Sequence, residues 1–216
     1  MKKTSIFLAA ALLTCSCELE ESGVEDSLQM IEELGGIWQS CIGPDDNGEY
    51  SKIKYGFSNL RFAELNEYGF KDSTCEGDSN YILSYQGTVA GGVVLDETDD
   101  PSSLNVAKAI NFKYTSVVLT VTSEAGASLL NAEQVCGYSA WENSISASVQ
   151  GAECELRSQL MHTPEVEAVL YSSYKVTENE LYLGLIDSLS GKDESDRITS
   201  FAPALSLIQK SSEPGS

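Results

Sequence analysis

Short stretches of strand-forming residues, separated by clusters of Gly, Asn and Asp, run through most of this chain of 216 residues. The stretch 110–122 is the clearest, because it is rich in β-branched residues and alternates over Val117, Leu119 and Val121. The other predicted strands cover 50–57, 59–66, 81–88, 92–95, 145–149, 167–176, 180–186, 197–201 and 205–209. Together these stretches predict an all-β fold, either a single antiparallel β-barrel or a β-sandwich, with one or two short helices.

Two stretches are predicted as helices. The segment 124–134 is rich in Ala and Leu, which favour helices. Before the first strand, Leu28, Ile31 and Leu34 recur on one side of a short helix that ends at a pair of glycines. No repeat or linker marks a second domain. The predicted organisation is therefore a signal at 1–17, a tether with a short helix at 18–35, one β domain at 36–210 and a disordered tail at 211–216.

The N-terminus has the features of an export signal. A basic start at 1–3 precedes an apolar run at 6–13, which is too short to span a bilayer of about 30 Å. The boundary that follows resembles a bacterial lipoprotein box, in which a cysteine is acylated before the signal is removed. The resemblance implies a lipid on Cys17, which follows a small serine, with Cys15 as the alternative. An ordinary secretory signal followed by two incidental cysteines is the other interpretation.

The residue after the predicted lipid site indicates a location. Glu18 would follow acylated Cys17, and it is not the aspartate associated with inner-membrane retention in enteric bacteria. We therefore expect an outer-membrane lipoprotein of the cell envelope that faces the periplasm, with exposure at the cell surface as the alternative. Several acyl chains, such as palmitate, would give a lasting anchor, because each buried methylene contributes about 0.8 kcal/mol.

The chain is strongly acidic. Its formal charge of −20 becomes −22 when Lys2 and Lys3 leave with the signal. Binding to nucleic acid through phosphate neutralisation is therefore not expected, and anionic membrane surfaces should repel the folded domain. The N-terminal lipid is then the expected membrane contact. The same acidity is suited to a cationic partner in the envelope, although its commonest role is solubility.

Four cysteines remain after the signal, which is an even number in an exported chain. Because the periplasm is oxidising, they predict two disulfides out of three connectivities. We predict Cys41 with Cys75 and Cys136 with Cys154, since each pair closes a local loop. A zinc site is not predicted, because no two of these cysteines have CxxC spacing and His162 is the only histidine.

Several residue groups resemble a known family. They are 36–41 (Gly-Ile-Trp-Gln-Ser-Cys), 68–75, Cys136-Gly137-Tyr138 with Trp141, 151–154, 171–175 and 181–184. Together they resemble uncharacterised proteobacterial lipoproteins that begin with a GxW segment, over most of 36–208. The resemblance implies exported, paired cysteines and supplies no activity.

The GxW segment, Gly36 to Trp38, also resembles the first strand of lipocalins. In that family the tryptophan packs at the closed end of an eight-stranded barrel beneath an arginine. The resemblance implies a lipocalin-like barrel and assigns Arg197 as that arginine. A core tryptophan in any β fold is the alternative explanation of Trp38.

No catalytic residue, metal or cofactor is predicted. A nucleophilic triad would have to use His162, and no serine lies in a GxSxG segment. Acidic clusters at 45–49, 96–100 and 187–196 are typical of solvated loops, although they could also be calcium ligands or the paired carboxylates of a hydrolase.

Tyrosines give the best indication of a binding surface. Five of them, on successive predicted strands, could present amphipathic rings at the mouth of a barrel: Tyr50, Tyr55, Tyr68, Tyr81 and Tyr85. The alternative is that they are ordinary strand residues at the edge of a core. The sequence thus favours a lipid-anchored, non-catalytic barrel that binds a small apolar ligand or a cationic envelope partner. A periplasmic hydrolase that uses carboxylates and a purely structural lipoprotein remain the alternatives.

Overall fold

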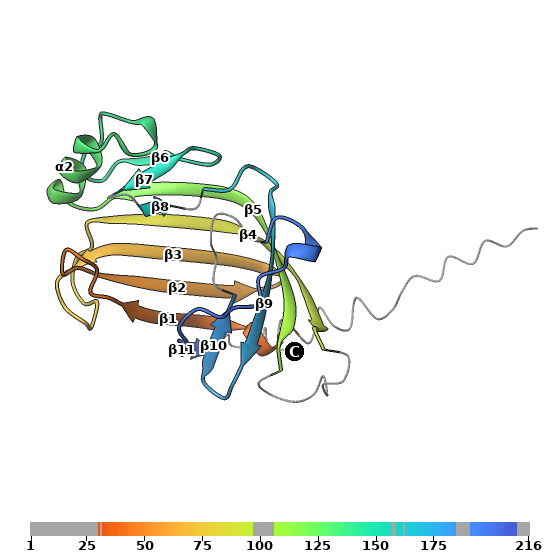
Figure 1. The fold of residues 1–216 in the computed structure, drawn as a ribbon. Coiled ribbons are helices and arrows are strands. Elements are labelled where there is room, and N and C mark those ends of the chain that lie inside the picture. Colours follow the sequence, from red (N-terminus) through yellow and green to blue (C-terminus); the bar gives the residue numbers. More distant parts are fainter. Residues whose placement is uncertain are drawn as a thin grey trace, which may run out of the picture.

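The computed structural model describes residues 30, 32–96, 106–156, 159–161, 163–184 and 191–210 (Figure 1). The predicted signal, Cys15, Cys17, most of the predicted tether, His162 and the predicted tail lie outside these residues. Within the described part, no helix combines the length and the apolar character that crossing a bilayer requires.

Eight antiparallel strands form a closed barrel, which confirms the barrel prediction. The strands follow one another in the order β4-β3-β2-β1-β11-β10-β9-β5, and pairing between β4 and β5 closes the ring. Their bounds are β1 (Gly36–Ile42), β2 (Tyr50–Ser58), β3 (Arg61–Phe70), β4 (Tyr81–Val94), β5 (Lys108–Val121), β9 (Val169–Val176), β10 (Glu180–Leu183) and β11 (Leu205–Lys210).

The long strands β4 and β5, of 14 residues each, reach beyond the barrel. One half of β5, Lys108 to Lys113, pairs with β9 and belongs to the ring. The other half pairs with the short strand β6 (Ser146–Ser148). The sheet therefore continues past the closed ring, toward the left of Figure 1.

A second layer covers this extension of the sheet. It contains the helix α2 (Glu124–Ala132), the short 3-10 helix η1 (Val135–Gly137) and the strands β7 (Cys154–Leu156) and β8 (Gln159–Met161) (Figure 1). The helix confirms the prediction at 124–134, and the Ser123 hydroxyl caps it by accepting the Gly126 N–H at 3.0 Å. Buried side chains of this layer, such as Leu130, Trp141 and Leu156, join one hydrophobic core with the barrel strands.

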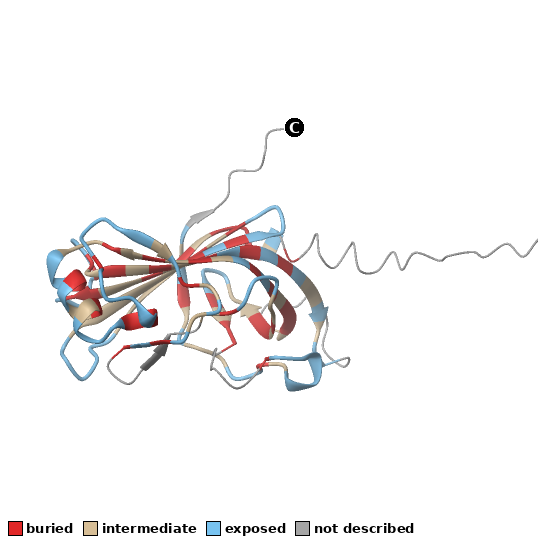
Figure 2. Ribbon diagram, turned by 90° about the horizontal axis from the view of Figure 1, so that it is seen from above, coloured by how far each residue is buried: buried red, intermediate tan, exposed pale blue. Residues whose placement is uncertain are grey.

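Burial alternates along the strands, as expected when one face of each strand points to the core (Figure 2). On β5, for example, Ile110, Phe112 and Tyr114 are buried, whereas Asn111 and Lys113 on the other face are not. Phe62 packs edge to face against Phe112, with ring centres 5.0 Å apart, and against Tyr114, at 5.5 Å. The core thus lies inside the barrel and under the second layer.

Both predicted disulfides are present. Cys41 on β1 bonds to Cys75 in the connection between β3 and β4, and Cys136 in η1 bonds to Cys154 on β7. The first ties β1 to a loop, and the second holds the covering layer together.

The chain just before β1 packs on one end of the barrel. Met30 and Leu34 are buried, and the Trp38 indole N–H donates to the Leu34 carbonyl oxygen at 2.7 Å. Glu33 forms an ion pair with buried Lys108 and accepts a hydrogen bond from the Tyr174 hydroxyl at 3.0 Å. These contacts connect the predicted N-terminal helix, of which residues 30 and 32–34 are described, to β5 and β9.

Three strand predictions were wrong. The predicted strands 81–88 and 92–95 form one continuous strand, β4. The predicted strand 59–66 begins at Arg61, because Asn59 and Leu60 both have positive φ and form the tight turn of a β-hairpin. The predicted strand 197–201 is not a strand, and only Phe201 forms a bridge, to Gly184. Side-chain hydrogen bonds hold the segment 197–201 against β9 in place of strand pairing. Arg197 donates to the Ser172 carbonyl oxygen, and the Ser173 hydroxyl donates to the Ile198 carbonyl oxygen.

Candidate ligand site in the barrel interior

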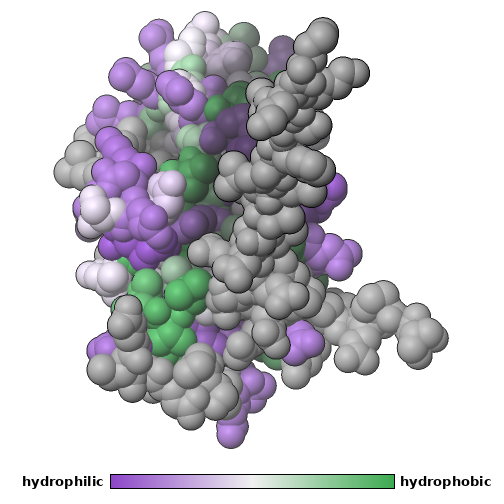
Figure 3. Space-filling model, turned by 90° about the vertical axis from the view of Figure 1, so that its right-hand side faces the viewer, coloured by the Kyte–Doolittle hydropathy of each residue, from purple (hydrophilic) through white to green (hydrophobic). Residues whose placement is uncertain are grey.

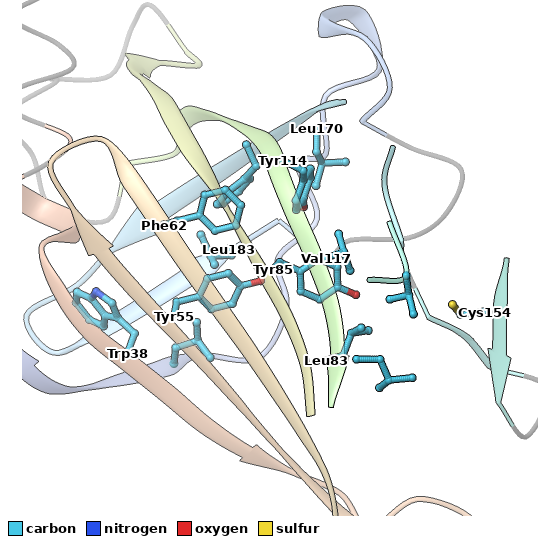
Figure 4. Close-up of a cluster of buried hydrophobic side chains, with 14 of the residues drawn as sticks. Trp38, Tyr55, Phe62, Leu83, Tyr85, Tyr114, Val117, Cys154, Leu170 and Leu183 are labelled. Atoms are coloured by element: carbon cyan, nitrogen blue, oxygen red, sulfur yellow. The ribbon is translucent and has the colours of Figure 1, made fainter. Parts of the chain in front are cut away.

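A carboxylic acid, Glu64, lies inside the barrel. It occupies β3 directly opposite Tyr55 on β2 and Tyr85 on β4. The same row continues to Trp38 on β1 and Val117 on β5, and all five side chains are buried. Figure 4 shows the four apolar and aromatic members of this row gathered in the interior. Glu64 is only 7% exposed, which is unusual for an acidic residue.

The next inward position on β3 is also polar. Asn66, which is 9% exposed, lies between Ile53 on β2 and Leu83 on β4. Its side-chain N–H donates to Glu64 Oε1 at 2.8 Å, and the Tyr55 hydroxyl forms a second hydrogen bond to the Glu64 carboxyl group. The Asn66 Oδ1 atom is buried and has no hydrogen-bond partner among the described residues. Leaving such an acceptor unsatisfied costs about 1–3 kcal/mol.

The interior changes the acidity of Glu64. Removal from water raises the pKa of its carboxyl group to about 7, and the hydrogen bonds from Asn66 and Tyr55 lower it by a smaller amount. In the described part of the chain, no Lys, Arg or His forms an ion pair with Glu64. Above a pH of about 7 the site therefore carries a negative charge that no described cation compensates.

Tyrosine rings surround this acid. Burial, and the negative charge of Glu64 in second place, raise the pKa values of Tyr55, Tyr85 and Tyr114, so their hydroxyl groups stay protonated at neutral pH. The rings of Tyr85 and Tyr114 lie 6.0 Å apart between centres. Tyr68 stacks on Tyr81, with ring centres 4.9 Å apart.

The five predicted tyrosines are not all together. Tyr55, Tyr81 and Tyr85 are buried in the core, and half-buried Tyr68 packs against it, so these four face the interior. Tyr50 is half-buried at the first position of β2, beside a register shift, and is not part of the core. The expected position at a barrel mouth was therefore wrong for the three buried tyrosines, because they belong to the buried core and not to an exposed rim.

Glu64, Asn66 and Tyr114 were not among the residues predicted from the sequence. A signal was available for the first two, because Phe62, Glu64 and Asn66 occupy alternate positions of the predicted strand 59–66. When the apolar members of such a series are buried, the polar members must face the same interior.

The structure corrects the expected position of Arg197. Its guanidinium carbon lies 5.5 Å from the centre of the Tyr171 ring and not over Trp38. Arg197 donates to the Ser172 carbonyl oxygen at 2.7 Å and to Asn111 Oδ1 at 2.8 Å. Because Asn111 points to the outer face of β5, Arg197 fastens a segment outside the barrel, whereas Trp38 is buried inside it.

The acidic loops have local structural roles where they are described. The Asp45 carboxylate accepts the backbone N–H groups of Asn47 and Glu49, and Asp193 accepts those of Ser195 and Asp196. These bonds form turns of the kind that aspartate favours. Among the described residues, no three His, Cys, Asp or Glu side chains are grouped as metal ligands would be.

Apolar side chains also reach the surface. Figure 3 shows a patch of them on the face at the right of Figure 1. A shallow apolar recess, lined by Met30, Leu34, Phe57, Leu60 and Val89 among others, lies where the N-terminal helix meets the barrel. Other exposed apolar residues, such as Ile145 and Val166, lie in the loops of the covering layer. Individual residues of this kind are common on protein surfaces.

Comparison with known proteins assigns no family. No protein-family model matches this chain, and no curated protein matches it in sequence.

Proposed function

We propose that this protein is a lipid-anchored binding protein of the bacterial cell envelope, which holds a small ligand inside its barrel. The observation that carries the proposal is the buried Asn66 Oδ1 atom, which has no hydrogen-bond partner, beside the uncompensated acid Glu64. Buried polar atoms are nearly always satisfied in folded proteins, so an acceptor without a partner beside a buried acid supports a site that a ligand completes.

Binding explains this site better than hydrolysis by paired carboxylates. Glu64 is the one carboxylic acid among the buried residues of the described chain. A glycosidase needs two such groups across one substrate bond. A single acid with a neighbouring amide and several tyrosines offers hydrogen bonds and apolar contact instead.

Anchoring rests on the N-terminal sequence. A basic start, an apolar run and Cys17 at a lipoprotein-like boundary support export and acylation. The two disulfides agree with an oxidising compartment. We expect Cys17→Ser to abolish incorporation of labelled palmitate and to release the protein from membranes, and Cys15→Ser to have neither effect. The reverse pattern would move the lipid to Cys15, and labelling of neither cysteine would contradict the anchor.

Native mass spectrometry tests ligand binding. The domain is exported to the periplasm without its lipid, purified, and measured under native conditions and again after denaturation and extraction. We expect a small molecule at a stoichiometric level in the wild type. The variant Glu64→Gln should lose it, whereas the matched control Glu67→Gln, which alters a partly exposed acid on the same strand, should retain it. An empty wild-type protein with both disulfides intact would contradict the proposal.

A further inference from the structure

Hydrogen-bond acceptors outnumber donors at the centre of the barrel. An ionised carboxylate can only accept hydrogen bonds, and its two oxygens have about four lone-pair positions. Two groups are seen to donate to Glu64, Asn66 Nδ2 and the Tyr55 hydroxyl. Asn66 Oδ1, the acceptor of the same amide, has no donor. The group that completes this site therefore brings N–H or O–H donors.

Charge narrows the choice among donors. The buried cation Lys108 is paired with Glu33, and Arg197 lies on the outer face of the barrel. Neither is paired with Glu64. A buried carboxylate is stable when a cation accompanies it, because removal from water penalises an isolated charge by several kcal/mol. A cationic donor would satisfy the charge and the free acceptor together, whereas an alcohol or an amide would satisfy only the acceptor.

The aromatic lining favours the same chemistry. Tyr55 and Tyr85 flank Glu64 on the neighbouring strands, and Tyr114 packs near Tyr85. The faces of tyrosine rings carry partial negative charge and attract cations, while their carbon atoms suit an apolar body. An acidic ligand would be repelled by Glu64.

We propose that the ligand of this barrel is an apolar molecule with a protonated amine, which donates to the Glu64 carboxylate and to Asn66 Oδ1 between the tyrosine rings. This inference rests on the proposed function, because it names the class of the ligand that the interior binds. It would make the protein a carrier or receptor of organic amines.

Isothermal titration calorimetry with matched probes tests the inference. The probes are straight-chain alkylamines from butylamine to decylamine, each compared with the alcohol of the same chain length. Titrations are run above the Glu64 pKa of about 7, so that the acid is ionised. We expect each amine that fits to bind at least about tenfold more tightly than its alcohol. In Glu64→Gln the amine should fall to the affinity of the alcohol, and in the control Glu67→Gln the difference should persist.

The outcomes separate the two proposals. If alcohols bind as tightly as amines, or if Glu64→Gln leaves the preference for amines unchanged, the interior binds ligands but the assignment of an amine to Glu64 is wrong. If neither series binds to the wild type, both the amine assignment and the interior binding site are contradicted. Circular dichroism of Glu64→Gln establishes that this variant is folded. The double variant Glu64→Gln, Asn66→Asp restores a carboxylate beside position 64, and it should bind the amines more tightly than Glu64→Gln alone.

Discussion

At the scale of single residues, the burial of Glu64 makes stability depend on pH. Its pKa is about 7 in the folded chain, against an ordinary value of 4.5. Between these two values the folded state holds a proton that the unfolded state has released. Stability should therefore be fully present below the lower value and fall as pH rises toward 7, by about 1.4 kcal/mol per pH unit.

We expect Glu64→Gln to remove this part of the pH dependence. Glutamine keeps the shape of the protonated acid and has no charge to bury, so the variant should be more stable than the wild type above pH 7. Urea unfolding across the range from 4.5 to 7 measures the difference in slope. Equal slopes for the two proteins would show that Glu64 titrates as an ordinary exposed acid, and Glu67→Gln provides the control.

The sequence contains the information that places Glu64 and Asn66 inside, because both share the inward parity of Phe62 and Tyr68. The sequence does not show that Asn66 Oδ1 lacks a hydrogen-bond partner. The surroundings of this atom include Ile53 and Leu83, which are distant from Asn66 in the chain and adjacent to it in the sheet. Arg197 illustrates the same limit, since its partners Asn111 and Ser172 lie on two other strands.

At the scale of elements, α2 is fixed by a close approach at its first turn. Gly126 lies against the backbone of Asn80, and a Cβ atom at this position would overlap the Asn80 carbonyl oxygen. The Ser123 hydroxyl also donates to Asn80 Oδ1 at 2.8 Å. The helix is therefore docked on the turn before β4 through contacts that leave no room for a larger residue.

Gly126→Ala should destabilise the protein although alanine is the better helix former. Propensity alone favours alanine by about 1 kcal/mol, but overlap with a backbone atom costs about 1–3 kcal/mol. Thermal unfolding should show a lower midpoint for Gly126→Ala and an unchanged or higher one for the exposed control Ser128→Ala. A higher midpoint for Gly126→Ala would mean that α2 does not pack this closely.

The disulfide between Cys136 and Cys154 should stabilise the covering layer. It closes a loop with a sequence separation of 18, which corresponds to about 3 kcal/mol in the chain-entropy model. We expect the double variant Cys136→Ser, Cys154→Ser to lose about that free energy of unfolding, with faster amide hydrogen exchange in 124–156. In the matched variant Cys41→Ser, Cys75→Ser the faster exchange should fall on β1 and the loop 71–80. Uniform changes over the whole chain in both variants would contradict these separate roles.

Strand positions were mostly predictable because alternation and turn residues are local signals. The helix at 124–134 and the strand at 110–122 are examples. The segment 197–201 was misassigned because its structure depends on side-chain bonds to β9. The short strands β7 and β8 lie beside the second disulfide and have too few residues for a periodic signal.

At the scale of the whole molecule, closure of the barrel creates the interior in which Glu64 is buried. Closure needs β4 to pair with β5 and β1 to pair with β11, and the second pair joins the two ends of the domain. Such long-range pairing, like the extension of β4 and β5 under a second layer, is not encoded in any short stretch of sequence. The sequence therefore predicted a barrel or a sandwich, and only the pairing of strands decides between them.

The central claim is that the barrel holds an uncompensated acid that an amine completes. The most direct test is carbon-13 NMR titration of labelled glutamate side chains, with Glu64 assigned from its absence in Glu64→Gln. The account predicts a pKa of about 7 in the free protein and a value well below this when the tightest alkylamine is bound, because a neighbouring cation stabilises the carboxylate. A pKa near the ordinary value of 4.5 in the free protein, or one that saturating amine leaves unchanged, would contradict the account.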